Sequence, residues 1–408
     1  MFSNNLTLPE GSEGLPISED EEIICGEYET YTLARFLFIF VSSWIALFGT
    51  SGNLFLLYLF SARNYPNTPP TLYPGVLAIL DAIICAMYIF LFGADAAIVF
   101  LHIKSLFVLY YIYVIPAFVI SRITQLAIPY MLIFATLERF VWLAGDMRNR
   151  ILKRMYSVQG RYITMAVSLS CCVLLRMPTA FATTIYEYPK CEDFFRSKTA
   201  SAAPWVYENV IYHYYDFHLL SIAQTVFPFF VLLTFNVIIV KKVANMDFSV
   251  HKSSVYSKNS LNSTQQSSVY GQQAVPQSPS LMTANENSSL GLVARRNSLR
   301  RTNPAVKSAI YTMLAIVTSY LVSNTLHLVL TVLERSKSDL LIHPEDPNLA
   351  STFHTVFSDV VSFVYMFTSA IRLVIYYVCN PAIRADIKAW FSDCCVGRKE
   401  VKDMPVNL

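Results

Sequence analysis

Two pairs of ionisable residues in this sequence could form ion pairs inside a membrane or at its edge. Glu138 and Arg139, followed by Phe140, end a long apolar run. Asp81 and Arg372 each stand inside an apolar run of their own. Such side chains are costly to bury in lipid, so they usually pair with one another or take part in function. For Glu138 and Arg139 a second interpretation stays open, in which the charges only mark where a helix leaves the bilayer.

The elements that would hold these residues are seven apolar runs. The sequence has 408 residues and is 54% apolar but only 14% charged, which does not fit a soluble protein. A span needs about 20 apolar residues, and lipid offers the backbone no hydrogen-bond partner, so each run is expected to be a helix. The runs are 33–60, 72–100, 106–142, 162–186, 210–240, 305–333 and 353–379. They predict an all-α membrane protein with a single seven-transmembrane helix bundle.

The distribution of basic residues predicts how this bundle is oriented. Lys and Arg gather in the turns after the first, third and fifth runs and in the tail, whereas the opposite loops are mixed or acidic. Because basic loops stay in the cytosol, we expect an extracellular amino terminus and a plasma-membrane location. The net charge of +3 reflects this asymmetry and does not indicate a nucleic-acid-binding surface. The expected regions are an extracellular tail (1–32), spans one to five (33–240), a disordered Ser-, Gln- and Asn-rich cytosolic loop (241–303), spans six and seven (304–379) and a cytosolic tail (380–408).

The tail after the seventh run predicts a short amphipathic eighth helix. It begins at Asn380-Pro381, and its apolar side would lie along the inner membrane leaflet. The apolar residues are Ile383, Ile387, Trp390 and Phe391. Cys394 and Cys395 follow where a palmitoylated pair would anchor this helix. The alternative, a pair of free cytosolic thiols, stays open.

Two further positions match modification motifs. Asn5, in Asn5-Leu6-Thr7, is a glycosylation acceptor if the amino terminus is extracellular. Ser298 follows two arginines, as basophilic kinases prefer, and a phosphate there would alter what docks on the cytosolic loop. Such four-residue matches also occur by chance in Ser-rich loops, so both interpretations of Ser298 stay open.

Five landmarks, in order along the chain, resemble those of rhodopsin-like G-protein-coupled receptors. They are Gly52-Asn53, Leu77-Ala78-Ile79-Leu80-Asp81, Glu138-Arg139-Phe140, Phe227-Pro228-Phe229 with Asn236, and Tyr376 before Asn380-Pro381. Asp81-Ala82-Ile83-Ile84, the stretch around Pro228 and the segment from Tyr320 to His327 are similar to invertebrate (nematode-type) receptors for FMRFamide-like neuropeptides. The resemblance implies a receptor for an extracellular peptide that couples to a heterotrimeric G protein.

The resemblance also implies a mechanism. Glu138 would hold Arg139 in the resting receptor, and the ligand would favour a state in which helix six swings outward and Arg139 contacts the G protein. Two motifs depart from the family: helix six lacks Cys-Trp-x-Pro, and Arg372-Leu373 replaces Asn-Pro in helix seven. An alternative therefore stays open, in which the chain couples little to G proteins and acts as a scaffold, partner subunit or decoy.

Polar residues in the outer halves of the helices are the candidates for ligand contact. Ser121, Arg122 and Gln125 lie near one face of helix three. Four more stand at comparable depth: Asp95, Asp216, His327 and Asp359. A neuropeptide ending in Arg-Phe-amide would use one of the three carboxylates for its arginine. The alternative for each residue is an interhelical hydrogen bond or a side chain that reaches the membrane surface.

Other classes of protein are less well supported by the sequence. It contains no metalloprotease motif, no phosphate-binding glycine loop and no nucleophile elbow, so we expect neither an enzyme nor a bound cofactor or metal. Its prolines do not form the matching helix breaks of a transporter built from two repeats.

Cysteine positions predict one disulfide. The family usually joins helix three to the second outer loop, but no cysteine lies between Cys85 and Cys171. In the expected topology only Cys25 and Cys191 face the oxidising side. We therefore expect a Cys25–Cys191 bond, with two free thiols or an intermolecular pair as the alternatives.

Asp81 and Arg372 lead to the last expectation. Related receptors use the helix-two aspartate to bind sodium, but here helix seven supplies an arginine. Because pairing offsets the desolvation of both groups, we expect an Asp81–Arg372 salt bridge in place of the ion. In the alternative, Arg372 extends to lipid phosphates and Asp81 is protonated or bound to Asn53.

Overall fold

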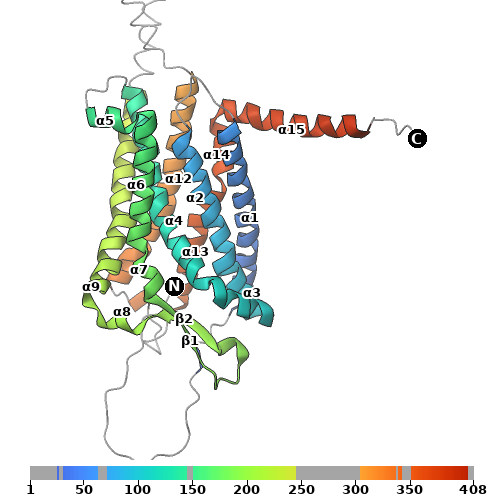
Figure 1. Cartoon of the computed structure of the whole chain (residues 1–408), viewed down its shortest axis with the longest axis vertical. Coiled ribbons are helices and arrows are strands. Elements are labelled where there is room, and N and C mark those ends of the chain that lie inside the picture. The colour runs from blue at the N-terminus through green and yellow to red at the C-terminus, as the bar shows by residue number, and fades with distance from the viewer. Residues whose placement is uncertain are drawn as a thin grey trace, which may run out of the picture.

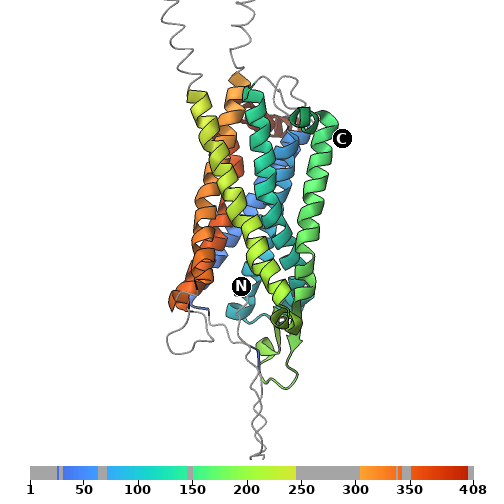
Figure 2. The same cartoon turned by 90° about the vertical axis from the view of Figure 1, so that its left-hand side faces the viewer.

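Long helices lie side by side along one axis of the molecule. The computed structural model describes residues 25–26, 31–62, 71–144, 150–244, 304–336, 339–341 and 351–402, and every structural statement below concerns these residues. Helix α15 (Pro381–Lys402) extends sideways from one end of the bundle, and strands β1 (Thr183–Glu187) and β2 (Lys198–Ala202) lie at the other (Figures 1 and 2). We refer to these as the α15 end and the hairpin end.

Six of the seven expected spans are helices long and apolar enough to cross a membrane, within the part of the chain described. They are α1 (Leu33–Ala62); α2, η1 and α3 (Leu72–Tyr88, Ile89–Gly93 and Ala94–Leu101); α4 (Lys104–Ala144); α6 and α7 (Val158–Arg176 and Pro178–Ala182); the stretch Val210–Ala244; and α12 (Pro304–Arg335). The seventh run forms two helices, α13 (Thr352–Ala370) and α14 (Arg372–Cys379), with a bend of 42° between them. By length and composition, the chain is therefore a mostly helical, multi-pass membrane protein.

The fifth span is irregular because of a proline. It begins with α9 (Val210–His213) and continues as two π-helices, η3 (Tyr214–Leu220) and η4 (Ile222–Val226), before an α-helix over 227–244. Pro228 has no backbone N–H to donate to the preceding turn, and the widened π-turns lie just before it. The helix also runs past the expected end at 240, so the first residues assigned to the cytosolic loop are helical.

The expected fourth span was placed too far along the chain. Its helix begins earlier, at Val158, where the Ser157 side chain accepts a hydrogen bond from the Gly160 N–H. Residues 183–186, expected to be helical, instead form β1, which pairs antiparallel with β2 from Thr183 opposite Ala202 to Glu187 opposite Lys198. Thr183, Thr184 and Ile185 are β-branched, and this residue type favours strands over helices.

Short elements complete the connections. They are α5 (Arg150–Met155), η2 (Phe194–Arg196), α8 (Pro204–Glu208) and η5 (Asp339–Leu341). At the start of α15, the Asn380 side chain accepts hydrogen bonds from the N–H groups of Ala382 and Ile383. Pro381 then occupies the first helical position, where a missing N–H is harmless.

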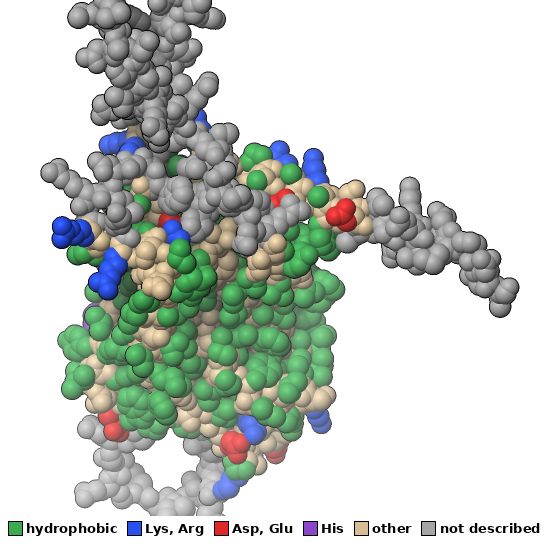
Figure 3. All heavy atoms as spheres, turned by 45° about the horizontal axis from the view of Figure 1, so that its top comes forward, with side chains coloured by type: hydrophobic (Ala, Val, Ile, Leu, Met, Phe, Trp, Pro, Cys, Tyr) green, Lys and Arg blue, Asp and Glu red, His purple; other side chains and the backbone are tan. Residues whose placement is uncertain are grey.

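Glycines in α1 let the helices around the bundle interior approach closely. A Cβ on Gly49 would lie 2.6 Å from the Ala370 Cβ and 2.9 Å from the Cys85 sulfur, so α1, α2 and α13 meet there. The main hydrophobic core extends along this interior and includes Leu56, Leu77, Met131 and Ile316. In contrast, large apolar side chains cover the visible outer flank, with charged side chains gathered toward the two ends (Figure 3). This arrangement is typical of a bundle surrounded by lipid.

Candidate functional site

Asp81 and Arg372 form an ion pair in the bundle interior, as the sequence predicts. The distance from Arg372 Nε to Asp81 Oδ2 is 2.9 Å, and both side chains are buried. Neither Asp81 oxygen accepts a hydrogen bond from the described residues. The contact is therefore an ion pair without the bidentate hydrogen bonds that arginine often forms with a carboxylate. It joins α2 to α14, just beyond the 42° bend between α13 and α14.

Asn53 fixes the backbone next to this ion pair. Its side-chain amide donates to the Gly49 carbonyl at 2.8 Å and to the Ser369 carbonyl at 2.9 Å. Ser369 lies in the last turn of α13, where carbonyl groups lose their helical partners. Asn53 therefore provides a hydrogen-bond donor for a carbonyl at the end of α13. Arg372, which lies opposite Asp81, follows directly after this helix end.

Glu138 pairs with an arginine of the next span and not with its neighbour. Arg161 Nε of α6 lies 2.7 Å from Glu138 Oε1, and the Glu138 side chain is completely buried. The described residues contain no ion pair between Glu138 and Arg139. Adjacent residues of a helix point in different directions, so the expected contact is not formed in this structure, and α6 supplies the partner instead.

Tyr156 covers this ion pair from the short turn between α5 and α6. Its hydroxyl donates to the Phe134 carbonyl at 3.3 Å. Burial raises the pKa of the Tyr156 hydroxyl above its usual range, and the nearby Tyr73 and Glu138 act in the same direction. Tyr156 therefore remains neutral and keeps its hydrogen bond.

Arg139 is buried with unused donors. Its side chain is 5% exposed, and neither Nε nor Nη1 has a hydrogen-bond partner among the described residues. Tyr376 is also buried, and its ring contacts Phe60 with 5.3 Å between centroids. Because a buried guanidinium without acceptors is unfavourable, Arg139 is suited to receive an acceptor from a partner.

Pro228 is buried in span five near a contact with span six. The Asn324 amide of α12 donates to the Thr225 carbonyl at 3.3 Å, within the π-helical turn before the proline. Asn324 belongs to the segment from Tyr320 to His327 of α12. The sequence did not identify this residue as a link between the two spans.

Two of the candidate ligand residues are bound to the amino-terminal segment instead. The Tyr31 hydroxyl donates to Asp95 Oδ2 at 2.8 Å. Arg35 donates to both Asp359 oxygens, at 2.6 and 3.3 Å, and its guanidinium lies 4.1 Å from the centre of the Tyr31 ring. Asp95 and Asp359 therefore connect residues at the start of α1 to α3 and α13.

The other candidates come together between spans three, four, five and six. We call Ser121, Arg122, Gln125, Arg176, Asp216, Gln224 and His327 the polar cluster. Arg176 of α6 pairs with Asp216 at 3.3 Å and donates to the Gln224 carbonyl oxygen. Gln125 contacts Gln224 and Ser121, each at 3.5 Å. The sequence had assigned no ligand role to Arg176 or Gln224.

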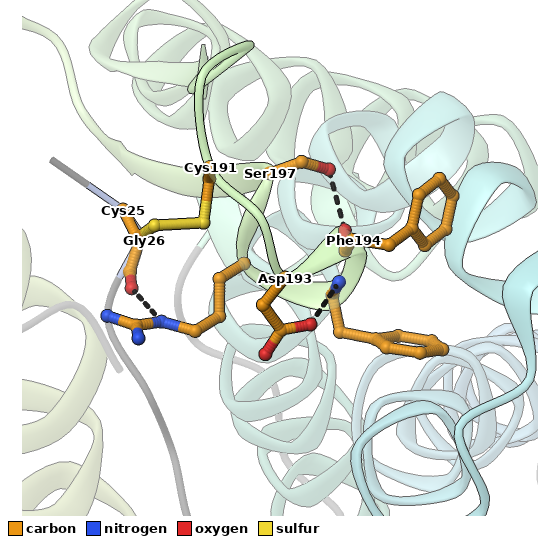
Figure 4. The surroundings of a disulfide bond; sticks show 8 residues. Cys25, Gly26, Cys191, Asp193, Phe194 and Ser197 are labelled. Carbon is orange, nitrogen blue, oxygen red and sulfur yellow. Dashed lines mark hydrogen bonds between the residues drawn. A yellow bond between two sulfur atoms is a disulfide. The ribbon is translucent and has the colours of Figure 1, made fainter. Parts of the chain in front are cut away.

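The Cys25–Cys191 disulfide expected from the sequence is present. Figure 4 shows it beside the loop between β1 and β2. The Arg196 side chain donates to the Gly26 carbonyl at 2.9 Å. The Gly26 N–H donates in turn to the Arg196 carbonyl at 3.0 Å. Cys25 and Gly26 are thus bound to the hairpin loop, and Tyr31 and Arg35 are bound to α3 and α13.

We expect Cys191→Ser to loosen this segment and lower stability by about 2–5 kcal/mol, the usual effect of losing a native disulfide. Maleimide labelling of intact cells should modify Cys25 in this variant but neither cysteine in the unreduced wild type. Cys171→Ser, which removes an exposed free cysteine, is the matched control. Labelling of Cys191 in the unreduced wild type would contradict the bond.

Four predicted modification residues lie wholly or partly outside the described part of the chain. Asn5 and Ser298 lie outside the described residues. Cys394 and Cys395 belong to the backbone of α15, but their side chains are outside the described part. Ile383 and Ile387 of the same helix pack into the bundle core and Trp390 contacts Phe55 of α1, so only part of the expected lipid face is exposed.

Comparison with known proteins assigns no family to this chain: no protein-family model and no curated protein matches it.

Proposed function

We propose that this chain is a plasma-membrane receptor of the seven-helix, G-protein-coupled type, with an extracellular amino terminus and a peptide ligand. In this proposal α13 and α14 together form the seventh span, and α15 is the amphipathic eighth helix on the cytosolic membrane surface. The disulfide at the hairpin end supports this orientation, since such bonds form on the oxidising side of the membrane.

The observation that carries the proposal is the state of Arg139. It lies in the last turns of span three, toward the α15 end, with Nε and Nη1 unpartnered. Glu138, the acidic neighbour that would neutralise it, is bound to Arg161. A guanidinium held in this way can donate to carbonyl groups of a G protein inserted at the α15 end when span six moves outward.

The test measures ligand-dependent G-protein dissociation in cells that display the chain, with a library of extracellular peptides. We expect Arg139→Ala to abolish the response at unchanged surface expression. Arg154→Ala, which removes an exposed arginine of α5 at the same end, should respond like the wild type. An amino-terminal epitope should be accessible on intact cells and a carboxyl-terminal one only after permeabilisation.

One observation favours the second candidate, a scaffold, partner subunit or decoy that couples little. The Asp81–Arg372 and Glu138–Arg161 pairs lock α2 to α14 and α4 to α6. A chain that reaches the surface in the expected orientation, yet activates no G protein with any peptide and has no basal activity, would favour this candidate and contradict the receptor.

A further inference from the structure

The polar cluster contains more positive charge than its contacts neutralise: Arg176 is buried and Arg122 is half-buried. Arg122 and Arg176 are close enough for their charges to repel. The ion pair that the cluster contains joins Arg176 to Asp216, whose side chain is 46% exposed. No carboxylate of the described residues comes within ion-pair distance of Arg122, whose guanidinium lies 5.0 Å from the centre of the Phe118 ring.

Glu334 does not remove this excess. The charges of Asp216 and Glu334 both act on Arg122, but Asp216 pairs with Arg176, and Glu334 contacts His354 at 3.5 Å with its side chain 41% exposed. Partly solvated carboxylates beyond ion-pair distance are screened and neutralise the half-buried Arg122 guanidinium poorly.

Hydrogen-bond donors are also in excess. Arg176 is buried, with Nη1 facing Asp216 and Nη2 bound to Gln224, while its Nε has no hydrogen-bond partner. His327 Nδ1 is likewise buried without a partner. An arginine has five donor hydrogens and no acceptor, so two arginines and a histidine in one cluster require acceptors that the described residues do not supply.

We propose that the polar cluster binds a carboxylate of the ligand, with Arg122 as its main ionic partner and Arg176 Nε and His327 as further donors. This inference rests on the proposed receptor function and assigns the charge of its ligand. It also reverses the expectation from the sequence. The carboxylates meant for a basic peptide already serve the chain's own residues: Asp95 binds Tyr31, Asp359 binds Arg35 and Asp216 binds Arg176.

Aromatic side chains beside the cluster indicate what the carboxylate is attached to. Phe118 lies next to Arg122, and Tyr212 is within electrostatic range of Arg122 and Arg176. The Tyr212 ring contacts Trp205 with 4.8 Å between centroids. An apolar or aromatic acid fits these surroundings, either the free carboxyl terminus of a peptide or a small organic acid.

The test uses the purified full chain in phosphatidylcholine nanodiscs and follows thermal unfolding. The probes are two matched pairs: 3-phenylpropionate with 3-phenylpropanamide, and N-acetyl-Phe-Phe as the free acid with its carboxyl-terminal amide. We expect each acid to raise the midpoint saturably, and its amide to bind at least about tenfold more weakly. Tighter binding of the dipeptide acid would identify a peptide terminus, and tighter binding of 3-phenylpropionate a small organic acid.

Arg122→Gln separates a binding role from a structural one. We expect this variant to lose the preference for acid over amide while the empty protein keeps its stability, because the half-buried Arg122 has no ion pair among the described residues. Lys198→Gln, at an exposed cation of β2, should keep the preference. Equal effects of acid and amide, no effect of either acid, or an unchanged preference in Arg122→Gln would overturn the proposal. No G protein is present, so failure of coupling leaves this result intact.

Discussion

Replacing either Asp81 or Arg372 alone is expected to destabilise the bundle far more than replacing both. Their 2.9 Å contact lies between α2 and α14, and both side chains are buried. Removing one partner leaves the other charge without compensation, which typically costs about 3–5 kcal/mol. We expect Asp81→Asn and Arg372→Gln each to reduce surface expression and the thermal midpoint of the purified chain, and the double variant to be milder than the sum of the two effects.

Sodium offers an independent readout of the same ion pair. While Arg372 occupies the position opposite Asp81, exchanging sodium for potassium should leave the thermal midpoint of the wild type unchanged. Arg372→Gln frees the carboxylate, so its midpoint should rise with sodium, and the double variant should again be insensitive. The exchanged pair, Asp81→Arg with Arg372→Asp, is expected to recover part of the stability. Strict additivity of the single effects, or a sodium-dependent wild type, would show that the two residues act separately.

The sequence predicted those features that follow from the cost of placing groups in lipid. Apolar runs identified the spans, and the expense of a buried charge predicted the Asp81–Arg372 pair. The sidedness of the membrane, judged from basic residues, selected Cys25 and Cys191 as disulfide partners. Each of these inferences needs only the side-chain type of a residue and its depth in the membrane. Hydropathy and the distribution of charge indicate this depth from a single sequence.

Contacts that depend on helix rotation and tilt could not be predicted in this way. Arg161 and Arg35 stand near span ends, where an arginine is normally interpreted as a marker of orientation, yet each pairs with a carboxylate of another span. The sequence predicts Asp95, Asp359 and Asp216 as ligand contacts because it does not reveal their partners Tyr31, Arg35 and Arg176. Hydropathy also predicts that the fourth span includes Thr183 and Thr184, although their β-branched side chains favour the strand that the structure contains.

Arg161→Gln is expected to reproduce the effects of Glu138→Gln. This expectation follows from the contact between the two residues, which the sequence does not predict. Glu138 is completely buried and its ionic partner is Arg161, 2.7 Å away on α6. Either substitution leaves one charge unpaired: the completely buried Glu138, or Arg161, whose side chain is 14% exposed. Each should therefore lower stability, by up to about 3–5 kcal/mol, whereas the double variant should be close to the wild type. Arg154→Gln, at an exposed arginine of α5, is the matched control.

The same comparison tests how span three is restrained in the proposed receptor. If Glu138 acts by anchoring α4 to α6, both single variants should raise basal G-protein dissociation to a similar level, measured at matched surface expression. If Glu138 instead neutralised Arg139 directly, Glu138→Gln alone would raise it, and Arg161→Gln would leave it low. The structure contains the first arrangement, since Glu138 contacts Arg161 while Arg139 Nε and Nη1 have no hydrogen-bond partner among the described residues. An increase confined to Glu138→Gln would therefore contradict the assignment of Arg161 as the residue that positions this carboxylate.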